Sequence, residues 1–188
     1  AAALVYDYVS FQQETSCPHI MVYDLGGGTF DVSILEVKGE IKEVLASCGD
    51  TALGGDDFDE RLVDFFQEQL SDQVRGELSL DTAARIRLRD IAEKTKIVLS
   101  DQPFYQVSEA AVLSVAGKPL NLHLEIKRHE FEELVIDLVE RTAEKVKDAL
   151  QEARLLPEDI GKILLVGGAT RMPVVQDMLK IQVLMSQF

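Results

Sequence analysis

Apolar residues recur along the chain with two periods, and the first is that of a β-strand. Segments that alternate between apolar and polar residues, or form short β-branched runs, are separated by glycine-containing turns. These predicted strands are Met21–Asp24, Phe30–Val37, Ile41–Cys48, Tyr105–Leu113, Leu120–Ile126 and Lys162–Val166. Lys38-Gly39 joins the second and third into an antiparallel hairpin, and a turn near Gly117 joins the next two. The last run is apolar from Ile163 onward, which is typical of a central strand.

The second period is helical. One helix is predicted after Gly54-Gly55, capped by Asp56 or Asp57, and a second from about Ser79 or Asp81 to Ser100. A long amphipathic helix should run from His129 to about Arg154, and Pro173 suits the first turn of another. The residues expected to face the core are Phe58, Leu62, Phe65, Phe66, Leu88, Ile91, Thr95, Val98, Phe131, Leu134, Val135, Leu138, Thr142, Val146, Ala149 and Ala153.

A triple glycine, Gly26-Gly27-Gly28, separates the first two predicted strands. Without side chains, such a turn can bring backbone N–H groups close to an anion. The bracketing carboxylates of Asp24 and Asp31 would repel a bare phosphate unless a divalent cation and its waters lay between them. Thr29 adds a hydroxyl at the lip of the turn. The alternative is a glycine-rich hairpin with solvated aspartates.

A second glycine turn, Gly167-Gly168, follows the last predicted strand and precedes the helix at Pro173. Two glycine turns at strand ends can converge on one nucleotide if their strands share a sheet. Neither turn has the lysine of a Walker A loop, and the chain has no G-x-G-x-x-G fingerprint.

Other polar residues have two possible interpretations. Glu93, Lys96 and Ser100 form a polar stripe away from the apolar side of their helix, which is ordinarily a solvated face. His19, His123 and His129 lack the spacing of a metal site or catalytic triad, so we interpret them as structural or solvated.

Composition narrows the class of protein. The 188 residues are 46% hydrophobic, which is enough for a core. A formal charge of −14 argues against nucleic acid as a partner, and no apolar run approaches the ~20 residues of a membrane span. Cys17 and Cys48 form no disulfide or zinc pattern, which favours a reducing, cytoplasmic location. Ala1–Ser10 contains helix formers without a cap, as if a helix had been cut from a longer chain.

Four motifs together resemble one known family. They are Asp24–Ser33 (DLGGGTFDVS), Leu53–Asp59 (LGGDDFD), Glu93–Ser100 (EKTKIVLS) and Val166–Pro173 (VGGATRMP). Their order and spacing are similar to those of the nucleotide-binding domain of DnaK-type 70 kDa heat-shock chaperones. The resemblance covers about residues 1–179, and the tail 180–188 departs from it.

The resemblance implies an α/β, actin-like ATPase (ribonuclease H-like) half-domain with an inserted α+β subdomain. The chain would be lobe II of the ATPase: 1–17 a remnant of the lobe-connecting helix and linker, 18–55 and 130–188 subdomain IIA, and 56–129 the inserted subdomain IIB. No stretch matches lobe I, which would supply the first phosphate loop and the catalytic lysine. We therefore expect the chain alone to fold without hydrolysing ATP.

The resemblance also implies site residues for ATP or ADP and Mg²⁺. Gly26, Gly27, Gly28 and Thr29 resemble the second phosphate loop, and Gly54 and Gly55 the glycine pair bordering the phosphates. Asp24, Asp31 and Thr29 resemble catalytic residues of the family. The two carboxylates would contact the metal ion through its bound water molecules. Glu93, Lys96 and Ser100 match residues that hold ribose and adenine, and Gly167, Gly168 and Arg171 match the adenosine motif. Ile97 replaces an adenine-stacking arginine of some members, which favours the bacterial branch.

The implied function is that of an ATP-dependent protein-folding chaperone. A J-domain cochaperone is expected on the IIA hairpin at Glu36, Glu40 and Glu43, and a nucleotide-exchange factor on IIB. Unfolded polypeptide would bind only through a substrate domain that the chain lacks. The alternatives are an actin-like filament or sugar-kinase module of the same superfold, or a cochaperone-binding domain without nucleotide.

Overall fold

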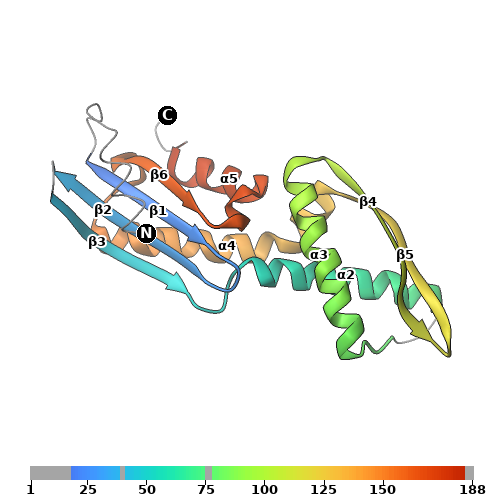
Figure 1. The fold of residues 1–188 in the computed structure, drawn as a ribbon. Coiled ribbons are helices and arrows are strands. Elements are labelled where there is room, and N and C mark those ends of the chain that lie inside the picture. Colours follow the sequence, from blue (N-terminus) through green and yellow to red (C-terminus); the bar gives the residue numbers. More distant parts are fainter. Residues whose placement is uncertain (1–17, 39–40, 75–77, 185–188) are drawn as a thin grey trace. The chain divides into compact units, whose positions relative to one another are not determined.

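A computed structural model describes residues 18–38, 41–74 and 78–184, which divide into two compact units (Figure 1). Unit 1 contains the described residues up to Gly55 and those from Leu138 onward. Unit 2 contains Asp56–Asp137. The predicted helix at Ala1–Ser10, the residue Cys17 and the proposed partner residue Glu40 lie outside the described residues.

Unit 1 is built on a four-stranded sheet. Its strands are β1 (His19–Leu25), β2 (Phe30–Lys38), β3 (Ile41–Asp50) and β6 (Ile160–Val166), in the order β3-β2-β1-β6. The pair β1/β2 and the pair β2/β3 are antiparallel, as the hairpin prediction requires, whereas β1 and β6 are parallel. The strands predicted around the triple glycine and after Lys38 are therefore confirmed.

The prediction that β6 is a central strand is wrong for the described sheet. Strand β1 has neighbours on both sides, and Ile20 to Tyr23 are all buried, whereas β6 pairs with β1 alone and leaves Leu165 42% exposed. A short apolar run shows that a strand meets apolar neighbours, but its position in the sheet depends on pairing with residues far away in the sequence.

Helix α4 spans Arg128–Ala153, and its residues from Leu138 onward, which belong to unit 1, lie along one face of this sheet (Figure 1). The hydroxyl of Tyr23 on β1 donates to Thr142 Oγ1 on α4 at 2.7 Å, and Thr142 Oγ1 donates to the Val139 carbonyl at 2.6 Å. Burial raises the pKa of the Tyr23 hydroxyl well above its usual range. A buried hydroxyl needs such a partner, so this bond ties the strand that leads into the glycine turn to the helix behind it.

Short elements complete unit 1. A 3-10 helix at Pro157–Asp159 precedes β6, and another at Gly168–Arg171 leads into α5 (Pro173–Leu179) and a π-type turn at Lys180–Leu184. Pro173 occupies the first turn of α5, as predicted.

Unit 2 contains α2 (Gly55–Val74), α3 (Thr82–Asp101), β4 (Phe104–Val115), β5 (Lys118–Lys127) and the first residues of α4. Strands β4 and β5 form an antiparallel hairpin, as predicted. Asp81 caps α3 by accepting a hydrogen bond from the Ala84 N–H at 2.7 Å.

Two local predictions for unit 2 are wrong. Helix α2 begins at Gly55, so Asp56 and Asp57 lie inside its first turn instead of capping it. Negative charge is also favourable there, because it faces the positive end of the helix dipole. The core prediction is also wrong at three positions of unit 2: Phe65, Val98 and Leu134 are only half-buried, and in α3 the neighbour Leu99 is the buried residue.

Candidate functional site

The triple glycine forms a tight turn between β1 and β2. The Gly26 N–H donates to the Thr29 carbonyl at 3.0 Å and closes the turn, while Gly27, Gly28 and Thr29 are exposed. A Cβ built on Gly28 would meet no described atom within 4 Å. Packing within the described residues therefore does not require glycine at this position, and the space beside it is open.

Asp24 and Asp31 lie directly opposite each other across β1 and β2. Residues paired in this way project from the same face of the sheet, where two negative charges oppose folding unless a cation balances them. Asp24 is half-buried and Asp31 is exposed. The pair thus provides two carboxylates beside the glycine turn, a donor set that suits a hard divalent cation.

Gly49 on β3 gives Asp31 its position. It is the register partner of Asp31, and a Cβ at this position would lie 2.7 Å from both Asp31 Oδ1 and the Phe30 carbonyl oxygen. Only a residue without a side chain leaves room for the carboxylate here. The sequence motifs did not single out Gly49, because the requirement comes from the pairing of β2 with β3.

The second glycine turn lies against the first. Gly167 has a φ of +91°, and a Cβ there would lie 2.1 Å from the Leu25 carbonyl oxygen and 3.1 Å from the Gly26 nitrogen. The Thr170 hydroxyl donates to the Gly167 carbonyl at 2.7 Å and holds this turn. The strands that precede the two turns share one sheet, which is the condition for the turns to converge on one ligand. Gly168 has open space around it, and Arg171 is exposed.

The pair Gly54-Gly55 supports the first turn from behind. A Cβ on Gly54 would lie 2.2 Å from the Gly27 carbonyl oxygen and 2.6 Å from the Gly28 nitrogen, and the Gly55 N–H donates to the Gly26 carbonyl at 2.8 Å. Both glycines are buried. Contact with the turn backbone therefore explains why glycine stands at position 54.

A charged contact holds the loop that carries this glycine pair. Arg141 Nη2 on α4 donates to Asp50 Oδ2 at 2.6 Å, and Asp50 Oδ1 accepts from the Ala52 N–H at 2.9 Å. The backbone hydrogen bond and the guanidinium lower the pKa of Asp50. These contacts tie the end of β3 to α4 just before the chain reaches Gly54.

The polar stripe of α3 lies in unit 2. Glu93 and Ile97 are exposed, whereas Lys96 and Ser100 are half-buried. The Ser100 hydroxyl donates to the Lys96 carbonyl at 2.9 Å, one turn back along the helix. The ammonium of Lys96 contacts Asp59 Oδ2 on α2 at 2.8 Å. The stripe is therefore not uniformly solvated.

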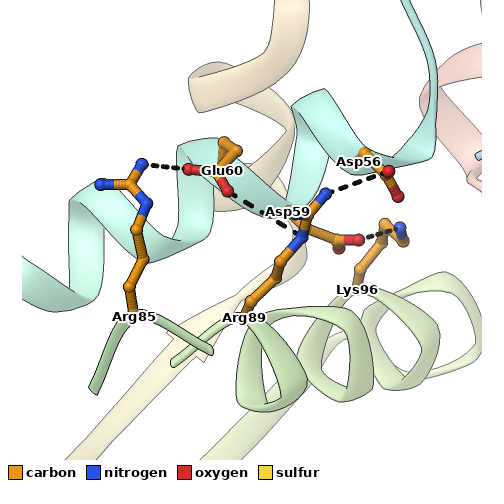
Figure 2. A network of polar contacts seen from close by, with 6 residues as sticks. All are labelled: Asp56, Asp59, Glu60, Arg85, Arg89 and Lys96. Atoms are coloured by element: carbon orange, nitrogen blue, oxygen red, sulfur yellow. Dashed lines mark hydrogen bonds and ion pairs between the residues drawn. The ribbon is translucent and has the colours of Figure 1, made fainter. Parts of the chain in front are cut away.

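Asp59 belongs to a network of charged residues between α2 and α3, shown in Figure 2. Arg85 pairs with Glu60, and Arg89 contacts both Asp56 at 3.0 Å and Glu60 at 3.9 Å. The Arg85, Arg89 and Asp56 side chains are exposed and Glu60 is half-buried, but the Asp59 side chain is only 4% exposed. Burial raises the pKa of Asp59 to about 6 against the opposing effect of the Lys96 ammonium.

Sequence reasoning did not identify Asp59 as a functional residue. A signal was present: Asp59 precedes Leu62, Val63 and Phe66 at helical spacing, so it falls within the buried stripe of α2. A carboxylate in that stripe requires a partner, and Lys96 is that partner.

The predicted site residues thus fall into two groups. Unit 1 brings together Asp24, Asp31 and the glycine turns, and unit 2 holds Glu93, Lys96 and Ser100. Within the described ranges, no three His, Cys, Asp or Glu side chains form a metal cluster. No helix in the described part of the chain is long and apolar enough to cross a membrane. His19, half-buried, approaches the Asp159 carbonyl at 3.1 Å, while His123 and His129 are exposed.

The described residues form a mixed α/β structure, as the resemblance implies, and two glycine turns meet at one end of its larger sheet. The family model described as Hsp70 protein matches residues 1–184. The chain belongs to the Hsp70 family, which has an actin-like ATPase fold.

Curated relatives carry the name chaperone protein DnaK. The chain is 48% identical over 181 residues to that of Thermotoga maritima and 45% identical over 180 residues to that of Thermosipho melanesiensis, covering 96% of this chain in each case. It is 45% identical over 161 residues to that of Mycoplasmopsis synoviae, covering 86% of this chain. The matched region is 30%, 30% and 27% of these relatives, so the chain spans less than a third of their length.

Proposed function

We propose that the chain is lobe II of the nucleotide-binding domain of an ATP-dependent, protein-folding Hsp70 chaperone. In this proposal residues 18–55 and 130–188 are subdomain IIA and residues 56–129 are the inserted subdomain IIB. Membership of the Hsp70 family favours this function over a filament-forming or sugar-kinase module of the same superfold. The names of the relatives, all chaperone protein DnaK, support it further.

One observation carries the proposal: Gly167 lies against Leu25 and Gly26, so two glycine turns meet at one end of the sheet. Open space beside Gly28 and Gly168 gives a ligand access to the backbone of both turns. Backbone N–H groups in such turns bind phosphate oxygens. We assign the phosphates to Gly26, Gly27, Gly28 and the Thr29 hydroxyl, with Gly54 and Gly55 supporting the turn.

Asp24 and Asp31 fit a magnesium ion that would accompany the phosphates. Two opposed carboxylates are favourable beside phosphate only when a cation neutralises both. Mg²⁺ usually keeps several waters, so these residues would hold the ion through its water shell. The bound ion would supply neutralisation of phosphate charge, and Asp31 would orient a water by hydrogen bonding.

Candidate residues for the nucleoside occur in each unit, and each set is considered by itself. Arg171 is exposed beside the second glycine turn, and we propose that its guanidinium stacks on an adenine ring. Glu93, Lys96 and Ser100 would bind ribose and adenine. The helical spacing of these three residues supports this role, because it puts them on one side of α3.

Phosphoryl transfer depends on positioning and on charge stabilisation around the transferred group. The carboxylates and the glycine turn supply only part of this, and the chain spans less than a third of its relatives. We propose that the remaining charged groups belong to the other lobe of such a domain. Losing about three charge-assisted hydrogen bonds of roughly 1.5–3 kcal/mol each weakens ADP binding by on the order of a thousandfold or more.

The test is an NMR titration of the isotope-labelled 188-residue chain with MgADP, because weak binding is expected. Signals of Gly28, Thr29 and Gly168 should shift together and saturate in the millimolar range. CTP at the same concentrations should shift the signals of the triple-glycine turn but leave the signal of Arg171 unchanged. A parallel assay should detect no release of phosphate from ATP above that of an Asp31→Asn variant. If MgADP leaves the glycine signals unchanged, the phosphate assignment is refuted.

Partner proposals follow the family. We propose that a J-domain cochaperone docks on the β2–β3 hairpin, where Glu43 is exposed on β3 and paired in register with Glu36. Glu36 is already 2.9 Å from the Lys38 ammonium, so Glu43 is the more available carboxylate. A nucleotide-exchange factor on unit 2, a polypeptide-binding domain elsewhere in the parent protein and a cytoplasmic location are further predictions.

A further inference from the structure

The ion pair between Asp59 and Lys96 differs in burial from every neighbouring pair in Figure 2. The side chains of Asp59 and Lys96 are 4% and 12% exposed, whereas those of Arg85 and Glu60 are 52% and 32% exposed. Arg89 and Asp56 are 44% and 58% exposed. Three more exposed contacts, Arg85–Glu60, Arg89–Asp56 and Arg89–Glu60, therefore connect α2 to α3 without the buried one.

A buried ion pair is seldom present for stability alone. Removing two charges from water costs about as much as their attraction returns, and apolar residues of similar volume often stabilise as well or better. Asp59 also has an unsatisfied atom: its Oδ1 is fully buried and has no hydrogen-bond partner among the described residues. Burial and, to a lesser degree, the nearby carboxylates of Glu93 and Asp56 thus disfavour the charged form of Asp59.

The partner of Asp59 is one of the three residues assigned above to ribose and adenine. Lys96 carries a flexible four-carbon side chain whose ordering costs entropy when a ligand binds. In Figure 2 the Asp59 carboxylate and the Lys96 ammonium point toward each other between the two helices. The 2.8 Å contact fixes the ammonium before any ligand arrives, so that its ordering becomes part of folding.

We propose that Asp59 is a positioning residue for the nucleoside end of the site, holding the Lys96 ammonium where ribose and adenine bind. This inference rests on the proposed function, because it takes Lys96 as a ligand-binding residue. Asp59 itself is too deeply buried to touch the ligand, and it acts only through Lys96.

The test compares Asp59→Asn, Lys96→Met and the double variant of the 188-residue chain with Glu60→Gln. Glu60 is the neighbour of Asp59 on α2, and its substitution removes the same charge from an exposed pair. At pH 7.5, Lys96→Met should weaken MgADP binding at least tenfold, as expected for one charge-assisted hydrogen bond. Asp59→Asn should weaken it about fivefold or more, and the double variant no more than Lys96→Met alone. Glu60→Gln should stay within twofold of wild type.

A second readout needs no ligand. In the wild-type chain the two Hε protons of Lys96 should have separate NMR shifts, because the side chain is fixed; in Asp59→Asn they should merge. Acidifying wild type from pH 7.5 to 5 should also merge the Lys96 Hε shifts, because Asp59 then takes up a proton. This experiment needs no substitution, so it remains decisive if the Asp59→Asn variant fails to fold. The other charged groups that act on Asp59 are the Lys96 ammonium and the carboxylates of Glu93 and Asp56.

Several results would overturn the inference. Unchanged Lys96 shifts in Asp59→Asn would show that Asp59 does not hold the ammonium. Wild-type MgADP affinity in Asp59→Asn, together with weak binding by Lys96→Met, would show that the anchoring has no effect on the ligand. If Lys96→Met binds MgADP like wild type while glycine-turn signals still shift, the assignment of Lys96 to ribose and adenine is wrong. The positioning role of Asp59 is then refuted as well. If wild type does not bind MgADP at all, the proposed function is refuted, and the Hε shifts alone decide whether Asp59 anchors Lys96.

Discussion

Alanine substitutions at Gly28 and Gly54 should separate ligand binding from folding. Both residues belong to glycine motifs beside the same turn, and both changes add a single methyl group. At Gly54 the new Cβ would lie 2.2 Å from the Gly27 carbonyl oxygen, whereas at Gly28 it would meet no described atom within 4 Å. We therefore expect Gly54→Ala to damage the fold and Gly28→Ala to damage only the site.

The magnitudes follow from these contacts. Relieving the clash at Gly54 requires the loop and the turn to move apart by roughly 1 Å, which costs about 1–3 kcal/mol as overpacking. The same movement weakens the hydrogen bond from Gly55 to Gly26, worth about 0.5–1.5 kcal/mol. Gly54→Ala should thus lower the free energy of unfolding by about 2–4 kcal/mol. Gly28→Ala should raise it slightly, by up to about 1 kcal/mol, because alanine restricts the unfolded chain.

Urea unfolding and MgADP titration of the two variants and wild type measure both effects. Gly28→Ala should unfold at or above the wild-type urea midpoint yet bind MgADP at least tenfold more weakly, because its methyl group occupies the space assigned to phosphate. Wild-type affinity in Gly28→Ala would show that phosphate does not approach Gly28. Wild-type stability in Gly54→Ala would refute the packing of the glycine pair against the turn.

Two further predictions concern charge. The raised pKa of Asp59, about 6 against an ordinary 3.8, means that the folded chain keeps a proton that the unfolded chain has lost between these pH values. The contribution of Asp59 to the free energy of unfolding therefore falls as pH rises from about 4 to 6, by up to about 3 kcal/mol. Urea unfolding of Asp59→Asn should lack this pH-dependent loss. If the free energies of unfolding of both proteins change with pH in parallel, the prediction is wrong. Glu43→Lys should weaken binding of a J-domain with a basic helix, most strongly at low salt, and unchanged association in a pull-down at low salt would exclude the hairpin as its site.

The local elements could be predicted because their signals are local. Alternation in Phe30–Val37 and helical spacing in His129–Arg154 depend only on which face of each segment is buried, and both predictions match β2 and α4 to within a residue or two. The position of β6 at the edge of the described sheet could not be predicted in this way. It depends on pairing with β1, about 140 residues earlier, and an apolar run does not specify its partner.

In the candidate site, too, local motifs could be predicted from the sequence, whereas contacts between distant residues could not. The glycine motifs could be recognised from the sequence, but the reason for each glycine could not. Gly54 and Gly167 are required by backbone contacts within unit 1, whereas Gly28 and Gly168 face open space. Asp59 is one of three aspartates within four positions, and only the packing of α2 on α3 shows which of them is buried against a lysine.

The parallel pairing of β1 with β6 also has a consequence for synthesis on the ribosome. Strands β1, β2 and β3 emerge consecutively and can form a meander, but β6 is made roughly 110 residues after β3 ends. At 5–20 residues per second this interval is roughly 5–20 s. During this interval unit 2 is translated, and the edge of β1 that will receive β6 has no partner among the described strands made so far. Such an exposed edge can pair with another nascent chain, so unit 1 is most open to wrong strand pairing in the seconds before β6 is made.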